Sequence, residues 1–127
     1  MKNNKPTILI IIGISGDLSR RKLLPAISQI ATTNMLGEQF KIVGVTRQSD
    51  MSIDNLLNKT KDKDYLKEHI ELFQMDLNNV DDYKKLGNYL NEIGKIWGKD
   101  VQRLFYLSVP PVVAKDIITF IGVSGLA

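Results

Sequence analysis

A glycine-rich turn that follows a run of aliphatic residues is the part of the chain best suited to chemistry. Ile8 to Ile12 are followed by Gly13, Ser15 and Gly16. A turn between a buried strand and a helix directs backbone N–H groups and the positive end of the helix dipole at one point, which favours phosphate. The pattern Gly-x-x-Gly-x-x-Ser, ending at Ser19, is weaker than the standard dinucleotide fingerprint, so a tight turn without a ligand stays the alternative.

Each residue type in this turn suggests a separate role. Gly13 permits the turn, and Gly16 lets a diphosphate approach the backbone. The Ser15 hydroxyl either donates to a phosphate or caps the helix by accepting a backbone N–H. Asp17 is expected to cap N–H groups, because its charge repels an anion. A nucleoside triphosphate loop is excluded, since the Gly-Lys-Ser/Thr ending is absent.

Arg47 follows a second apolar run, at the position where a dinucleotide-binding unit reads the adenosine ribose. An acidic residue there accepts from a free 2′-hydroxyl, whereas a guanidinium suits a 2′-phosphate. Arg47 therefore indicates NADP, with a solvated arginine as the plain alternative. Thr46 either donates its hydroxyl to the same phosphate or is an ordinary strand residue.

Short apolar runs alternate with longer amphipathic stretches, and this order predicts the elements that position the candidate residues. We expect strands at Thr7–Ile12, Lys41–Thr46, Leu72–Met75 and Arg103–Val109. Helices are expected at Leu18–Met35, Ser52–His69 (broken), Val80–Trp97 and Pro110–Ile121. Four strand-helix repeats predict an α/β fold with a doubly wound parallel sheet, a Rossmann-like dinucleotide-binding domain.

The first predicted helix has an apolar stripe and an internal proline. Leu23, Ile27, Ile30 and Ala31 are spaced to pack on the sheet. Pro25 removes one hydrogen bond from a helix, so we expect either a kink or a short first turn ahead of the main helix.

Composition excludes several classes of protein. The 127 residues fit one domain, and 43% hydrophobic with 24% charged residues is ordinary for a globular protein. A net charge of +3 does not argue for nucleic acid or membrane partners. With no cysteine and a single histidine, His69, no metal site is expected. The absence of a long apolar span or a signal peptide favours the cytoplasm.

Three segments together resemble a known family. "GISGDLSRRKLLPAI", "VGVTRQ" and "RLFYLSVPP" are similar, in order and spacing, to the amino-terminal domain of glucose-6-phosphate 1-dehydrogenase. The resemblance covers nearly the whole chain, so residues 1–127 are expected to form one NAD(P)-binding domain. It implies oxidation of glucose 6-phosphate to 6-phosphogluconolactone with hydride transfer to NADP, the entry step of the pentose phosphate pathway.

The resemblance also implies which residues contact the coenzyme. They are Gly13, Ile14, Ser15, Gly16, Asp17 and Leu18 at the diphosphate, Thr46 and Arg47 at the 2′-phosphate, and Val109 and Pro110 at the nicotinamide half. Lys22 matches a family lysine that faces substrate phosphate or coenzyme, with an exposed helical lysine as the alternative.

The family's catalytic residues are not matched in this sequence. A Glu-Lys-Pro strand and a histidine with an aspartate partner come later in the family than residue 127, and no motif surrounds His69. We therefore expect no catalytic residue in this chain. It is expected to be an isolated coenzyme domain that binds NADP and binds glucose 6-phosphate only together with the missing domain. A homo-oligomer is also expected.

Two other classes of function stay open. A non-catalytic dinucleotide-binding or interaction module is consistent with the missing catalytic half. Another NAD(P)-dependent oxidoreductase, such as a short-chain reductase, requires a Tyr-x-x-x-Lys motif, and no tyrosine here has a lysine four residues later.

Overall fold

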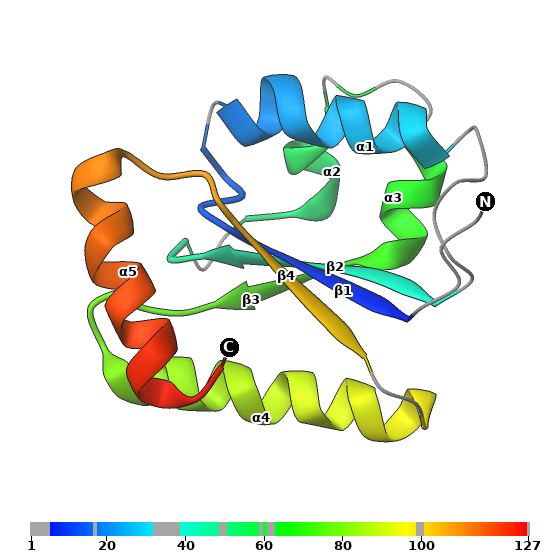
Figure 1. The fold of residues 1–127 in the computed structure, drawn as a ribbon. Coiled ribbons are helices and arrows are strands. Elements are labelled where there is room, and N and C mark those ends of the chain that lie inside the picture. The colour runs from blue at the N-terminus through cyan, green and yellow to red at the C-terminus, as the bar shows by residue number, and fades with distance from the viewer. Residues whose placement is uncertain are drawn as a thin grey trace.

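Four parallel strands form the sheet at the centre of the fold (Figure 1). The computed structural model describes residues 6–16, 18–31, 39–48, 51–58, 60, 63–98 and 101–126. Within these residues the strand order is β3-β2-β1-β4. The strands are β1 (Thr7–Ile12), β2 (Phe40–Thr46), β3 (Ile70–Gln74) and β4 (Gln102–Leu107). The first strand has the predicted bounds, and the other three overlap the predicted ranges with ends shifted by one or two residues.

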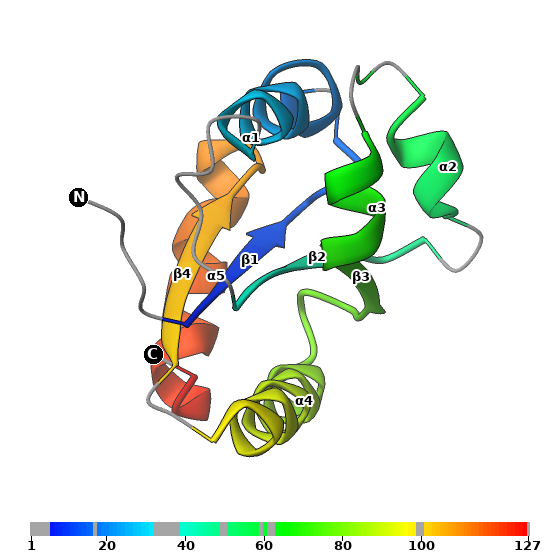
Figure 2. The same ribbon diagram turned by 90° about the vertical axis from the view of Figure 1, so that its right-hand side faces the viewer.

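Helices cover both faces of this sheet, as the doubly wound fold requires. Figure 2 shows α1, α2 and α3 on one side and α4 on the other, and α5 packs into the same apolar cluster as α4. The helical elements are η1 (Ser19–Leu23), α1 (Leu24–Ala31), α2 (Ile53–Leu56), α3 (Asp64–His69), α4 (Val80–Trp97) and α5 (Pro111–Ser124). The predicted break between 52 and 69 is confirmed, and α4 has the predicted bounds. Residues 32–35 of the first predicted helix lie outside the described residues.

The aliphatic run in β1 is explained by two separate cores, one on each face of the sheet. Ile8, Ile10 and Ile12 pack into the cluster that contains α4 and α5. Ile11 packs into the cluster that contains α1, α2 and α3. Because side chains alternate between faces, a strand buried on both sides must be apolar throughout.

The first helix begins with a π-helical turn, η1, ahead of α1. The N–H group of Leu24 donates to the carbonyl oxygen of Ser19, five residues earlier. Pro25 then lies at the second residue of α1, near a helix start, where the missing N–H costs little. The predicted short first turn ahead of the main helix is therefore confirmed.

The buried face of α1 differs from the predicted stripe. Leu24, Ile27 and Ser28 are buried, whereas Ile30 is 44% exposed. The three buried residues have the i, i+3, i+4 spacing of one helix face, and Ile30 lies to the side of that face. The predicted stripe is therefore wrong at Ile30.

The edge strand β4 keeps one apolar face uncovered. Leu104 and Tyr106 are exposed, and they align with Leu9 and Ile11 of β1 in the parallel register. None of the helices in the described ranges is both long and apolar enough to cross a bilayer.

Candidate functional site

A cleft of about 530 Å³ lies where the carboxyl ends of all four strands meet. This edge is where open α/β sheets receive their ligands. Its lining includes Gly13, Ser15 and Gly16 after β1, Thr46 and Arg47 at the end of β2, Asp76, Leu77 and Asn78 after β3, and Ser108, Val109 and Pro110 after β4. Seven of the predicted coenzyme-contacting residues therefore share one cleft: Gly13, Ser15, Gly16, Thr46, Arg47, Val109 and Pro110.

Gly13 is required by both its conformation and its surroundings. Its φ of 86° lies in the left-handed region that side chains disfavour. A Cβ atom there would collide with the carbonyl oxygen of Ser108 and lie 2.9 Å from Cγ1 of Val109. The glycine turn therefore lies directly against the end of β4, which brings the two predicted halves of the coenzyme site into contact.

Backbone N–H groups in the turn point inward rather than into the cleft. Those of Gly13 and Ile14 both donate to the carbonyl oxygen of Val45, at 3.0 and 3.2 Å, and that of Gly16 donates to Gly13 at 2.9 Å. The sequence predicted that backbone N–H groups of the turn are directed at a phosphate. For these three groups that prediction is wrong, because two donate to β2 and the third donates within the turn. Anion binding at this turn must therefore draw on other donors, of which the Ser15 hydroxyl is one.

Ile14 holds the turn through its side chain. The side chain is fully buried in the cluster beneath α1. It occupies the space that a Cβ of Gly44 would need, since that Cβ would collide with Cδ1 of Ile14. Ile14 therefore contributes an anchor rather than a side-chain contact to a ligand.

Thr46 joins the end of β2 to the glycine turn. Its Oγ1 lies 3.2 Å from Oγ of Ser15 and accepts the N–H of Gln48 at 3.1 Å. The residue is 5% exposed. The hydroxyl of Thr46 therefore forms hydrogen bonds within the protein, whereas the sequence suggested a direct contact with a phosphate.

Arg47 is exposed at the rim of the cleft. It also lines an adjoining space of about 470 Å³ with Gln74, Asp76 and Asp82. None of the ion pairs recorded between described residues involves its guanidinium. The guanidinium is therefore available to an anionic ligand.

The strand ends around Arg47 are tied together by hydrogen bonds. Its carbonyl oxygen accepts from Nε2 of Gln74 at 3.4 Å. The carbonyl oxygen of Thr46 accepts the N–H of Met75 at 3.0 Å. The position of Arg47 is thus defined by β3 as well as by β2.

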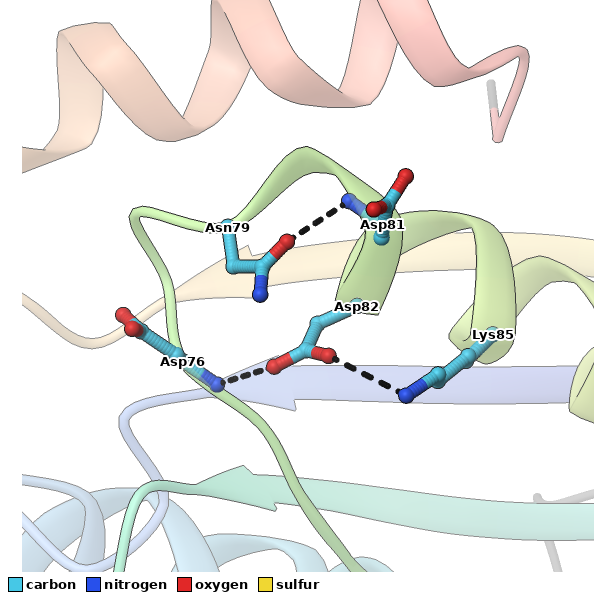
Figure 3. A network of polar contacts seen from close by, with 5 residues as sticks. All are labelled: Asp76, Asn79, Asp81, Asp82 and Lys85. Carbon is cyan, nitrogen blue, oxygen red and sulfur yellow. Dashed lines mark hydrogen bonds and ion pairs between the residues drawn. The ribbon is translucent and has the colours of Figure 1, made fainter.

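The loop after β3 forms a wall of the cleft that the sequence analysis missed. Figure 3 shows the N–H of Asp76 donating to Oδ2 of Asp82 at 2.8 Å, and Oδ1 of Asp82 lying 3.8 Å from Nζ of Lys85. Asn79 caps α4 by accepting the N–H of Asp81, and Asp76 accepts the N–H of Asn78 at 2.9 Å. Parallel strands end at one edge of a sheet. The polar residues after the third predicted strand could therefore have indicated this wall of the cleft.

Tyr83 stabilises this loop through a hydrogen bond. Its buried hydroxyl donates to the carbonyl oxygen of Leu77 at 2.8 Å. Burial, with a smaller contribution from the nearby charge of Asp76, raises the pKa of Tyr83 to about 12 from the ordinary value of 10.0. The phenol is therefore held in its neutral, donating form.

This shift predicts a loss of stability at alkaline pH. The folded chain holds the Tyr83 proton more tightly than the unfolded chain, so the stabilisation is complete below about pH 10 and is lost as the pH rises towards about 12. We expect the urea midpoint of the wild type to fall over that range. Tyr83→Phe should be less stable at neutral pH by about 1 kcal/mol and should show a smaller alkaline fall. An identical alkaline fall in the variant contradicts this role.

Two other predicted residues, both of them described, do not lie in the cleft. Leu18 is 56% exposed, and neither it nor the exposed Lys22 lines the cleft. Asp17 lies outside the described residues. Among the residues that are described, no cluster of three or more histidine or carboxylate side chains could hold a metal ion.

Comparison with known proteins identifies the domain. The family described as "Glucose-6-phosphate dehydrogenase, NAD binding domain" matches residues 10–127. Glucose-6-phosphate 1-dehydrogenase of Bacillus subtilis is 30% identical over 87% of this chain, and that of Aggregatibacter actinomycetemcomitans is 33% identical over 93%. This chain spans 25% and 26% of the length of these two relatives.

A solved structure agrees with this result. A glucose-6-phosphate dehydrogenase in complex with its substrate glucose-6-phosphate superposes with a TM-score of 0.81 at 25% identity, over 95% of this chain and 28% of that one. The residues that the family model matches, 10–127, include the glycine turn, the end of β2 and the start of α5. The chain therefore belongs to the family of glucose-6-phosphate dehydrogenase NAD-binding domains.

Proposed function

We propose that this chain is the NADP-binding part of an enzyme that oxidises glucose 6-phosphate to 6-phosphogluconolactone, the entry step of the pentose phosphate pathway. The observation that carries the proposal is the shared cleft, in which the glycine turn and Arg47 line the same space. A diphosphate and a 2′-phosphate are parts of one ligand, NADP, and this cleft offers groups suited to both.

The lining of the cleft fits a dinucleotide in three parts. The Ser15 hydroxyl is proposed as a donor to the diphosphate, which Gly16, having no side chain, leaves room to approach. Arg47 is proposed to bind the 2′-phosphate. Asp76, which lines the same space as Arg47, is suited to accept from an amino or hydroxyl group of the adenosine. Val109 and Pro110 border the nicotinamide half. NADP, when bound, supplies a nicotinamide ring that accepts a hydride.

An orphaned polar atom in the cleft wall supports a polar ligand. Oγ of Ser108 is buried and has no hydrogen-bond partner among the described residues. Buried polar groups are rarely left unpaired, because the lost hydrogen bond to water costs free energy. A coenzyme in the cleft is positioned to supply that partner.

The histidine of this chain is not placed to act as the general base of this reaction. The single histidine, His69, lies on α3 with Nδ1 2.7 Å from the carbonyl oxygen of Tyr65 and its ring stacked on that tyrosine. It does not line the cleft. Proton abstraction requires a base within hydrogen-bond reach of the sugar hydroxyl, so we place that step in the part of the enzyme that the relatives have beyond this domain.

We expect the 127-residue chain to bind NADP without turning over glucose 6-phosphate. Calorimetric titration should show saturable binding of NADP, and the same sample mixed with glucose 6-phosphate should form no reduced coenzyme above a protein-free blank. Turnover that rises in proportion to the chain's concentration contradicts the assignment of catalysis elsewhere. Failure of NADP to bind contradicts the coenzyme assignment itself.

Two further proposals concern the location of the protein in the cell and its self-association. We propose a cytoplasmic location; the relatives include chloroplastic enzymes as well. Self-association is also proposed, and the exposed apolar face of β4 at Leu104 and Tyr106 supports it.

A further inference from the structure

The buried hydroxyl of Thr46 lies between two parts of the proposed coenzyme site. It accepts the N–H of Gln48, one residue beyond Arg47, at 3.1 Å. On its other side lies the Ser15 hydroxyl at 3.2 Å, where either oxygen is able to donate. Ser15 lines the cleft within the glycine turn.

Counting protons decides the direction of this hydroxyl pair when an anion is bound. Each hydroxyl has one proton and two lone pairs. The N–H of Gln48 occupies one lone pair of Thr46, and the Thr46 proton remains available for Ser15. If Ser15 donated to Thr46 instead, its oxygen would present only lone pairs to the cleft, which repel an anion.

We propose that Thr46 is a positioning residue for the coenzyme diphosphate. It donates its proton to Oγ of Ser15, so that the Ser15 proton is directed into the cleft towards a phosphate oxygen. The chain of donors runs from the N–H of Gln48 through Thr46 and Ser15 to the ligand, and such chains strengthen each member by polarisation. The inference rests on the proposed binding of NADP at this turn.

This role makes a prediction that separates Thr46 from Arg47. The diphosphate is common to NADP and NAD, so loss of the Thr46 proton should weaken both coenzymes by the same factor. A hydrogen bond of this kind corresponds to an affinity change of about three- to tenfold. The preference for NADP over NAD, which depends on Arg47, should stay unchanged.

The test is calorimetric titration of NADP and NAD into Thr46→Val, which keeps the side-chain shape and removes the hydroxyl. Thr46→Ser should restore wild-type affinity for both coenzymes. Ser15→Ala should weaken both by a similar factor, and adding Thr46→Val to Ser15→Ala should weaken them no further, because Thr46 acts through Ser15.

Thr7→Val is the matched control for loss of a threonine hydroxyl from a buried strand. Thr7 is 7% exposed, begins β1 at the opposite edge of the sheet, and its hydroxyl lies 3.5 Å from Oε1 of Gln102. This variant should keep wild-type affinity for both coenzymes. An equal loss in Thr7→Val shows a general effect on the sheet and overturns the proposal.

Other outcomes also overturn the role of Thr46 without touching the proposed function. Wild-type affinity in Thr46→Val or in Ser15→Ala is one, and penalties that simply add in the double variant are another. A loss confined to NADP places the effect at Gln48 and Arg47 instead. Should Thr46→Val fail to fold, Ser15→Ala and Thr46→Ser decide the matter. If the wild type binds neither coenzyme, the proposed function itself is wrong.

Discussion

Replacing Arg47 with alanine is expected to weaken NADP binding by about 10- to 100-fold while leaving NAD binding nearly unchanged. A hydrogen bond to a charged group contributes about 1.5–3 kcal/mol, which corresponds to that loss. The guanidinium is free of ion pairs to described carboxylates, so its removal does not leave a protein charge unpaired. Added salt should reduce the difference, because Arg47 is exposed and therefore screened.

Calorimetric titration of NADP and NAD into the wild type and the variant measures this effect. Lys84→Ala is the control for loss of a positive charge, since Lys84 is an exposed residue of α4 that does not line the cleft. It should leave both affinities unchanged. Equal affinity of the wild type for the two coenzymes, or an unaltered preference in Arg47→Ala, removes the support for NADP.

Replacing Gly13 with alanine is expected to have the largest effect on stability. The left-handed conformation disfavours a side chain, and the new Cβ would collide with the carbonyl oxygen of Ser108. Backbone strain and overpacking together correspond to about 2–6 kcal/mol of unfolding free energy. Movement of the turn away from β4 should also abolish coenzyme binding.

Urea denaturation of Gly13→Ala beside Gly122→Ala checks this prediction. Gly122 lies within α5, and a Cβ there would meet no atom within 4 Å. Alanine is the better helix former by about 1 kcal/mol, so the control should be as stable as the wild type or more stable. Wild-type stability and NADP affinity in Gly13→Ala contradict the packing of the turn against β4.

The strands were predictable because their signals are local. Five aliphatic residues in succession indicate a strand buried on both faces, and β1 has the predicted bounds. The order of strand and helix segments then restricts the topology, since parallel strands need crossovers. The buried face of the first helix was predicted less well, because leucines at both 23 and 24 left its centre open: Leu24 is buried, and a face centred on it excludes Ile30.

The candidate site was predictable where a residue's chemistry matches a phosphate. Gly13, Ser15 and Arg47 were found by residue type and spacing, and they share the cleft. Ile14 was expected to contact the ligand, but its apolar side chain is buried in the core instead. Asp76 was missed because its place depends on a tertiary arrangement, the meeting of β3 with β2, and on a capped loop that no short motif describes.

The central claim is that NADP binds at the carboxyl edge of this sheet. Amide resonances followed by NMR while NADP is added to the isotopically labelled chain test it most directly. We predict saturable shifts at Gly13, Ser15, Arg47 and Val109, with little change at Thr7 and Gln102 on the opposite edge. Shifts centred on that opposite edge, or none at saturating NADP, would contradict the account.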